Sequence, residues 1–156
     1  MPKVIAPKGF HFVVRQNPYD SYSISIKLFK KNKEIGHVNL VREYKGTYST
    51  HSYLEPKYHN KGLGALMYAK AIQWGMEHCY RVRSSGSSSD AAQRMWRGKK
   101  ITKWFDIKVR RGKDYNGVIQ PSYDTFYPKP KKGDKLAKKC HGNSRVSRQS
   151  RKSSRR

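Results

Sequence analysis

The sequence predicts a mixed domain of the α/β (α+β) class over residues 1–128, followed by a disordered basic tail over residues 129–156. Three observations support this class. Strand-like segments precede a short loop with two glycines, a helical pattern of apolar residues follows the loop directly, and a strand, a helix and another strand come after that helix. At 156 residues the chain has room for one domain and a tail.

The first elements are three expected strands. Residues 22–29, YSISIKLF, alternate apolar and polar side chains with a period of two. KKNK then forms a turn, and residues 34–41 form the second strand of a hairpin. Residues 47–54, TYSTHSYL, are rich in aromatic and β-branched residues and stop before Glu55 and Pro56, because proline cannot donate to a strand ladder.

The elements after the glycine loop are expected to alternate between helix and strand. Apolar side chains recur at helical spacing from Leu63 to Trp74 and define one long helix. Residues 80–84 form a short strand, and Ser89 or Asp90 caps a second helix that extends through Trp96. Residues 104–109 form a further strand. Beyond Pro128 the apolar pattern ends, and the tail has too little apolar surface to offset the entropy of ordering it.

The charge predicts an anionic partner. The chain has 35 Lys and Arg against 10 Asp and Glu, a net charge of +25. Residues 129–156 carry 12 basic side chains and one acidic one, which leaves +14 on residues 1–128. Nucleic acid, anionic lipid or a phosphorylated cofactor fits such an excess. No apolar segment approaches the roughly 20 residues that a membrane span needs, so no membrane association is expected.

The N-terminus and the cysteines predict a cytoplasmic protein. MPKVIAPKGF lacks the apolar segment of a secretory signal. Cys79 and Cys140 are the only cysteines, and because one lies in the tail, no disulfide is expected. The six histidines and two cysteines show no metal-ligand spacing, which predicts no metal site. The oligomeric state is left open.

The glycine loop is the candidate binding site. Residues 54–65, LEPKYHNKGLGA, join a strand end to a helix through a proline, basic residues and two glycines. A helix N-terminus has unpaired N–H groups, and glycine lets the backbone approach a phosphate closely. The alternative is that Gly62 and Gly64 only permit a tight turn. A Walker loop needs a Gly-Lys-Ser or Gly-Lys-Thr ending, and a dinucleotide loop needs a third glycine, so both are disfavoured.

This segment resembles motif A of the GNAT N-acetyltransferase superfamily, Gln/Arg-x-x-Gly-x-Gly/Ala. The matching residues are His59, Asn60, Lys61, Gly62, Leu63, Gly64 and Ala65. The resemblance implies a central mixed, mostly antiparallel sheet flanked by helices, with acetyl-coenzyme A as cofactor. It also implies that the loop amides bind the pyrophosphate and that the backbone near Leu54 meets the pantetheine where the strand splays from its neighbour. Small, basic GNAT-like proteins of tailed phages are similar.

The resemblance continues in the second helix. The family pattern Asn-x-x-Ala-x-x-Leu-Tyr has its counterpart in Ser89, Ala92, Met95 and Trp96. Ser89 and Trp96 are therefore candidate cofactor contacts. Trp96 stands where the family has a tyrosine that often protonates the departing thiolate, and an indole N–H is not an acid near neutral pH. Tyr123 or Tyr127 is an alternative source of that proton.

Further residues have expected roles at the same site. Glu55, at the end of the central strand, and His51, within it, are the candidate bases for an amine. Five more are candidates for contacts with coenzyme A, namely Lys57, Lys61 and Arg94 for its phosphates, and Ser84 and Ser85 for its pantetheine.

Two functions follow as hypotheses. The first is acetyl transfer to an amine on an acidic or nucleic-acid-linked substrate, such as tRNA, or on a protein. The second is a catalytically inactive GNAT-fold protein that binds nucleic acid or has a structural role, for instance in a phage.

Overall fold

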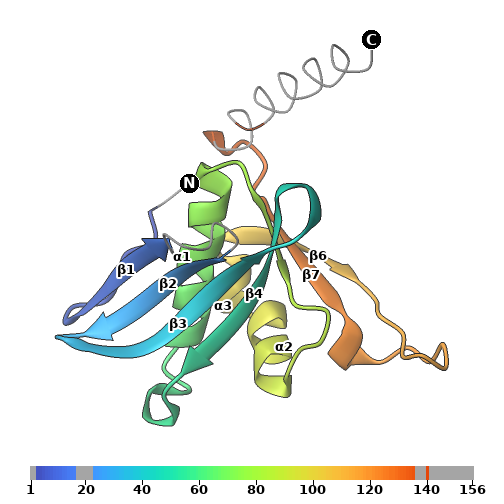
Figure 1. Cartoon of the computed structure of the whole chain (residues 1–156), viewed down its shortest axis with the longest axis horizontal. Coiled ribbons are helices and arrows are strands. Elements are labelled where there is room, and N and C mark those ends of the chain that lie inside the picture. The colour runs from blue at the N-terminus through green and yellow to red at the C-terminus, as the bar shows by residue number, and fades with distance from the viewer. Residues whose placement is uncertain (1–2, 17–22, 136–139, 141–156) are drawn as a thin grey trace.

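A five-stranded sheet forms the centre of the protein (Figure 1). The computed structural model describes residues 3–16, 23–135 and 140. The strands are β1 (Phe10–Gln16), β2 (Ser23–Lys30), β3 (Lys33–Arg42), β4 (Thr47–Leu54) and β5 (Arg81–Ser84). They lie in the order β1-β2-β3-β4-β5, with the first three pairs antiparallel and the pair β4–β5 parallel. The predicted mixed, mostly antiparallel sheet is therefore confirmed.

The β2–β3 hairpin follows the sequence pattern. Ile24, Ile26 and Leu28 are fully buried on one face of β2, and the residues between them are partly exposed. Lys31 has a φ of 53° in the turn to β3. Since successive side chains of a strand point to opposite faces, one face of the hairpin belongs to the core and the other is polar.

The helix α1 (Leu63–Glu77) covers the apolar face and lies behind the sheet in Figure 1. It connects β4 to the parallel strand β5, as a crossover helix does. Gly75 permits close contact between helix and sheet, because a Cβ there would lie 2.4 Å from a methyl group of Val82. The N-terminal segment crosses the same helix, where the Val4 amide donates to Oε1 of Gln73 at 3.0 Å.

A second unit lies beside β5. It contains α2 (Asp90–Arg97), α3 (Lys99–Thr102) and a two-stranded sheet of β6 (Phe105–Arg110) and β7 (Thr125–Pro130). Three short 3-10 helices complete the described elements, η1 (Tyr44–Gly46), η2 (Pro56–Tyr58) and η3 (Pro121–Tyr123). The Phe126 amide of β7 donates to Oγ of Ser84 in β5 at 2.9 Å, which joins the two units.

Asp124 holds the connection between β6 and β7 together. Its buried carboxylate accepts the Gly112 amide at 3.0 Å and Nη2 of Arg97 at 2.6 Å. The hydrogen bond from Gly112 lowers the pKa of Asp124, an effect that burial opposes and Arg97 reinforces. The carboxylate therefore stabilises the fold as an anion.

We expect Asp124→Asn to lower the free energy of unfolding at pH 7 by about 2 kcal/mol, typical for hydrogen bonds to a charged group. Because the folded pKa lies below the unfolded one, this contribution is fully present above about pH 4 to 5 and is lost as the pH falls through the folded pKa. Urea unfolding at pH 7 and at pH 3 checks it. A difference between the two proteins that stays constant over this range would contradict the account.

Two strands and one α-helix were not predicted. β1 and β7 form strands, and α3 follows α2 after Gly98. β7 extends to Pro130, two residues past the predicted domain boundary at residue 128. Most of the predicted disordered tail, residues 136–139 and 141–156, lies outside the described residues.

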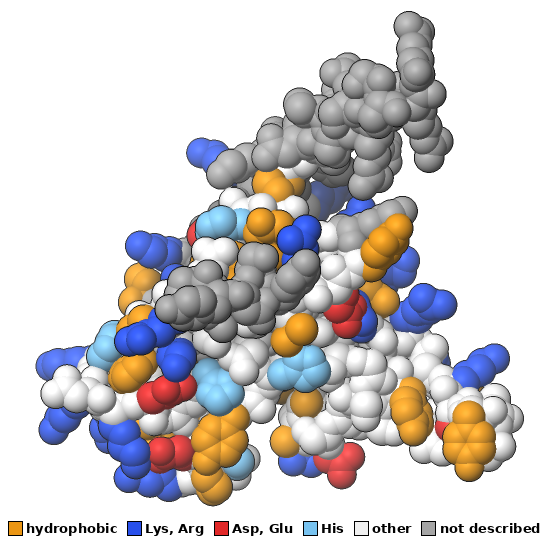
Figure 2. All heavy atoms as spheres, viewed as in Figure 1, with side chains coloured by type: hydrophobic (Ala, Val, Ile, Leu, Met, Phe, Trp, Pro, Cys, Tyr) orange, Lys and Arg blue, Asp and Glu red, His pale blue; other side chains and the backbone are white. Residues whose placement is uncertain are grey.

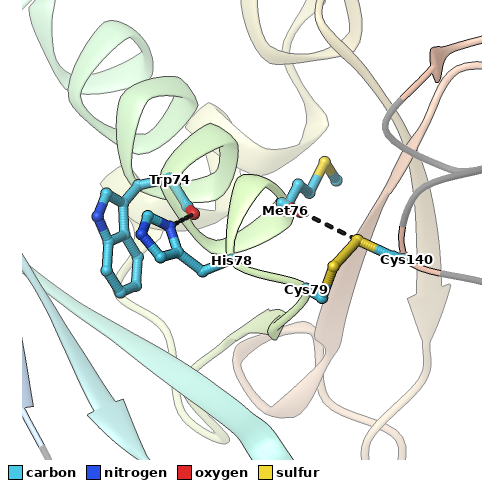
Figure 3. The surroundings of a disulfide bond; sticks show 5 residues. All are labelled: Trp74, Met76, His78, Cys79 and Cys140. Atoms are coloured by element: carbon cyan, nitrogen blue, oxygen red, sulfur yellow. Dashed lines mark hydrogen bonds between the residues drawn. A yellow bond between two sulfur atoms is a disulfide. The ribbon is translucent and has the colours of Figure 1, made fainter. Parts of the chain in front are cut away.

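The prediction that the cysteines do not pair is wrong, because Cys79 and Cys140 form a disulfide (Figure 3). Cys79 follows the end of α1, and its φ of 59° turns the chain there. Sγ of Cys140 lies 3.2 Å from the carbonyl oxygen of Met76. The bond links residues 61 positions apart, a contact that no local pattern in the sequence reveals.

We expect Cys140→Ser to lower the free energy of unfolding by about 2–4 kcal/mol, because a bond across so long a loop restricts the unfolded chain. Thermal melts of both proteins with and without dithiothreitol test this. Reductant should lower the melting temperature of the wild type and leave that of the variant unchanged. Equal melting temperatures for the oxidised and reduced wild type would contradict it.

Candidate functional site

The strands β4 and β5 separate halfway along β4. Their pairing covers Thr47–Thr50 on β4 and Arg81–Ser84 on β5, and it ends where β5 ends. The Glu55 amide donates to the Ile35 carbonyl on β3 at 2.9 Å. Because backbone groups alternate along a strand, the N–H and C=O groups of Leu54 and Ser52 point to the β5 side. Beyond Thr50, no described strand pairs with that side of β4.

The glycine loop lies at the end of this open edge. Asn60 and Gly62 have φ values of 61° and 78°, so residues with left-handed backbone alternate in the loop. Such loops form concave sites lined by N–H groups. Helix α1 has no side-chain N-cap, and the Leu66 amide donates to the Gly62 carbonyl at 3.2 Å. A Cβ on Gly64 would meet no atom within 4 Å, which leaves space at the helix N-terminus.

Lysine side chains surround the loop. The ammonium groups of Lys30, Lys57 and Lys61 lie 5.2–5.8 Å from the centre of the buried Tyr58 ring. Lys100 extends from α3 over the loop, so that its Nζ would lie 2.6 Å from a Cβ on Gly62. The predicted Lys57 and Lys61 thus lie at the loop, and Lys30 and Lys100 join them without having been predicted.

His59 supports the loop through its side chain. Its Nε2 lies 2.7 Å from the carbonyl oxygen of Leu54 and must donate to it, since a carbonyl only accepts. Its amide donates to the Pro56 carbonyl at 3.1 Å. The ring therefore folds back onto the end of β4. The sequence analysis predicted that His59 contacts the cofactor, together with Lys61, Leu63, Gly64 and Ala65.

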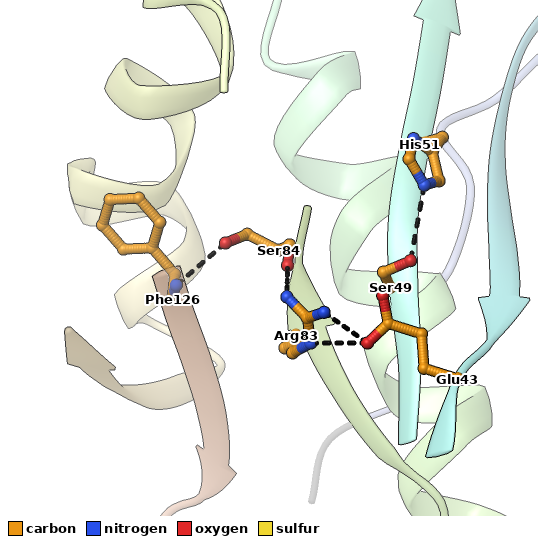
Figure 4. A network of polar contacts seen from close by, with 6 residues as sticks. All are labelled: Glu43, Ser49, His51, Arg83, Ser84 and Phe126. Carbon is orange, nitrogen blue, oxygen red and sulfur yellow. Dashed lines mark hydrogen bonds and ion pairs between the residues drawn. The ribbon is translucent and has the colours of Figure 1, made fainter. Parts of the chain in front are cut away.

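The two candidate bases have different surroundings. His51 is the first residue of β4 beyond the last pair with β5, and its Nε2 lies 3.3 Å from Oγ of Ser49 (Figure 4). It is exposed on the sheet face opposite to α1. Glu55 lies at the loop and pairs with Lys33, whose Nζ is 3.2 Å from Oε1. The structure thus separates them, with His51 at the opening and Glu55 beside the lysines.

The two serines predicted to contact pantetheine, Ser84 and Ser85, form hydrogen bonds within the protein. Ser84 is buried and accepts the Phe126 amide, as Figure 4 shows, and Oγ of Ser85 donates to the Ser87 carbonyl at 2.7 Å. Ser89 is the N-cap of α2, as predicted, and accepts the Ala92 amide at 3.2 Å. Arg94 lines a hollow of about 580 Å³ with other residues of α2 rather than the glycine loop.

Trp96 lies in the core rather than at a surface. Its side chain is 1% exposed, stacks on Phe126 with ring centres 5.7 Å apart, and meets the Tyr68 ring edge to face at 5.3 Å. The indole is enclosed by the rings of Tyr68 and Phe126. The structure therefore does not bring Trp96 together with the loop residues.

Tyr68 was missed by sequence reasoning. It lies on α1 one turn beyond Gly64, and its hydroxyl is 2.7 Å from Oγ of Ser52 on the open part of β4. Burial raises its pKa, so the hydroxyl keeps its proton at neutral pH. Its position just after the glycine loop, on the helix face toward β4, is the signal that identifies it once the strand and the helix are known to pack.

The sheet face opposite to α1 is polar and basic. Histidine side chains are visible on it in Figure 2, among many Lys and Arg and few Asp and Glu. His37 and Tyr53 meet there with ring centres 6.0 Å apart, and Nδ1 of His37 is 3.4 Å from Oε1 of Glu34. In the described part of the chain, no group of three His, Cys, Asp or Glu side chains is suited to hold a metal. None of its helices is long and apolar enough to cross a membrane.

The comparisons with known proteins agree with this geometry. A sequence model of the acetyltransferase (GNAT) family matches residues 5–99, and the chain belongs to that family. No curated protein matches it in sequence.

Solved GNAT structures share its fold, and two of them cover most of both chains. A putative GNAT acetyltransferase of Desulfovibrio desulfuricans has a TM-score of 0.55 at 12% identity, over 78% of this chain and 98% of that one. A GNAT acetyltransferase of Elizabethkingia anophelis, solved with acetyl-coenzyme A bound, has a TM-score of 0.51 at 14% identity, over 78% and 97%.

Proposed function

We propose that this protein is an N-acetyltransferase that moves the acetyl group of acetyl-coenzyme A to an amine. One observation carries the proposal: the unpaired edge of β4 leads directly into the glycine loop at the start of α1. Strand edge and loop together offer hydrogen bonds to an extended chain that ends in phosphates. Family membership and the fold shared with an acetyl-coenzyme A complex support the same assignment.

The residues of the loop fit the cofactor. The open space at Gly64 and the left-handed backbone of Asn60 and Gly62 let N–H groups face a pyrophosphate. The surrounding ammonium groups, Lys61 and Lys100 among them, neutralise its charge. When bound, the cofactor supplies an acetyl thioester. The backbone of Ser52 and the amide of Leu54 hold the pantetheine arm along β4, while the Leu54 carbonyl stays bound to His59.

His51 is the better placed of the two candidate bases. An amine must lose a proton to attack, and the free nitrogen of a neutral imidazole can accept it. His51 lies at the point where β4 and β5 separate, whereas Glu55 lies further along the chain and pairs with Lys33. His51 therefore accepts the amine proton, directly or through water.

Tyr68 supplies the second proton, in place of the family tyrosine that Trp96 replaces. The amine nitrogen forms a bond to the acetyl carbon, the carbon–sulfur bond breaks, and its electron pair stays on sulfur. The Tyr68 hydroxyl, directed at Ser52 on the open edge, then donates its proton to that thiolate. Solvent then returns a proton to Tyr68 and takes the amine proton from His51.

Detection of free coenzyme A tests the function. The purified protein is incubated with acetyl-coenzyme A and, separately, with aminoacyl-tRNA, polyamines and peptides with free N-termini, and the released thiol is measured. We expect release with at least one acceptor and a matching mass increase of 42 Da on it, about the mass of an acetyl group replacing hydrogen. Folded protein that binds acetyl-coenzyme A but acetylates none of these classes would contradict the proposal.

A second candidate function is nucleic-acid binding by an inactive GNAT fold. The buried Trp96 at the family tyrosine position and the net charge of +25 favour it. Binding to duplex DNA would then weaken with salt, with a log-log slope close to the number of phosphates contacted. Affinity that does not depend on salt would exclude it. The similarity to small proteins of tailed phages stays a prediction.

A further inference from the structure

A basic hollow lies on the β6–β7 unit, apart from the glycine loop. Its volume is about 460 Å³. It is lined by Arg110, Arg111, Gly112, Lys113, Tyr123 and two residues of β7, Thr125 and Tyr127. The function proposed above uses none of these side chains.

The walls of the hollow are held in place by the core. A Cβ on Gly112 would lie 1.9 Å from the Tyr123 carbonyl oxygen, so the two chain segments pack backbone against backbone. The buried carboxylate of Asp124 accepts one hydrogen bond from the Gly112 amide and another from Arg97. Lys113 pairs with Ile119 across the adjoining loop. The hollow is therefore a preformed part of the fold.

Three cationic side chains line the hollow. Within the described part of the chain, Arg110, Arg111 and Lys113 form no ion pair. Arg111 acts on Asp124 only at a distance, and that carboxylate already binds Arg97 and the Gly112 amide. An anion entering the hollow would thus meet three cations that form no ion pair with a described carboxylate.

The unit that carries the hollow is joined to the sheet at β5. Phe126, between Thr125 and Tyr127, donates to Ser84, and Ser84 is the β5 partner of Thr50 at the opening. The Ser88 amide also donates to the Ser122 carbonyl at 2.9 Å, which ties the chain after β5 to the segment before β7. The hollow is therefore part of a unit that is fixed to β5, the strand that separates from β4 at the opening.

We propose that this hollow binds the phosphate of a nucleotide-bearing acceptor, an inference that rests on the function proposed above. The planar guanidinium groups of Arg110 and Arg111 match the oxygens of a phosphate in pairs. The rings of Tyr123 and Tyr127, beside these cations, provide surfaces for stacking a base. Cations next to aromatic rings favour a nucleotide over an acidic peptide, which offers carboxylates but no ring to stack.

Binding of AMP tests the proposal, in a Gly64→Glu background that closes the glycine loop to phosphates. Calorimetry compares AMP, inorganic phosphate, adenosine and hexaglutamate. The test variant adds Arg110→Gln and Arg111→Gln. The control adds Arg15→Gln and Lys132→Gln, which remove the same charge from exposed positions elsewhere.

We expect AMP to bind more tightly than phosphate or adenosine, and its affinity to fall at least tenfold in the test variant only. Equal losses of AMP affinity in both variants would show that AMP binds through general surface charge. Tighter binding of hexaglutamate than of AMP would show that the hollow is a peptide site. Either result, or no binding of AMP to folded protein, overturns the proposal. Acetyl-coenzyme A binding to an otherwise wild-type Arg110→Gln, Arg111→Gln protein stays unchanged, which separates this test from that of the cofactor site.

Discussion

Gly64→Glu is expected to weaken acetyl-coenzyme A binding by about 100-fold or more while the fold is kept. The side chain enters open space, because a Cβ at this position meets no atom within 4 Å. Its carboxylate then stands at the N-terminus of α1, where the phosphates bind in our account. Two like charges about 4 Å apart near a protein surface repel by about 4 kcal/mol, so a loss of this size is reasonable. Titration calorimetry measures it.

Two control variants separate the effect of the added charge at position 64 from the effect of added bulk and of charge elsewhere. Gly64→Gln adds the same bulk without charge and should weaken binding less than Gly64→Glu does. Tyr115→Glu adds the same charge at a side chain that is 97% exposed on the β6–β7 connection, and should leave binding unchanged. If Gly64→Glu binds acetyl-coenzyme A as tightly as the wild type does, the cofactor does not lie at this loop.

Tyr68→Phe is expected to lower kcat by about 100-fold, at the low end of what a general acid contributes. The change removes one hydroxyl and keeps the ring that packs on Trp96. Steady-state rates with an acceptor identified by thiol release measure the effect. The Kd for acetyl-coenzyme A should change less than threefold, because the proton is needed only when the carbon–sulfur bond breaks.

A matched variant tests whether Tyr68 acts through Ser52. Ser52→Ala removes the hydrogen-bond partner of the Tyr68 hydroxyl but keeps the proton. We expect it to lower kcat less than Tyr68→Phe does. If both variants lower kcat equally, or if Tyr68→Phe weakens cofactor binding as much as it slows turnover, Tyr68 has a structural role and not that of an acid.

The strands and helices that could be predicted are those whose buried face is recorded in a local pattern of apolar residues. The alternation in β2 and the helical spacing in α1 record which face each element buries. β2 lies within one residue of its predicted position, and α1 begins at the predicted residue and extends three residues further. β1 is an edge strand with most of its side chains at least partly exposed, so it has no such alternation. β7 contains two prolines, which the sequence rules count against a strand.

The candidate site could be predicted only where it is continuous in sequence. The loop around Gly62 and Gly64 and the strand before it were found from their order along the chain. Tyr68 and Lys100 reach the site because α1 packs against β4 and α3 packs near the glycine loop. The local sequence pattern does not reveal such packing. The burial of Trp96 depends on Phe126, a residue of the unpredicted strand β7.

Calorimetric titration of acetyl-coenzyme A into the wild-type protein, beside acetylpantetheine, tests the central claim most directly. Acetylpantetheine carries the same thioester and arm but lacks the nucleotide and its phosphates. Our account predicts one site per chain, micromolar affinity for acetyl-coenzyme A, and binding of acetylpantetheine at least 100-fold weaker. Folded protein that binds neither molecule, or binds both equally well, would contradict it.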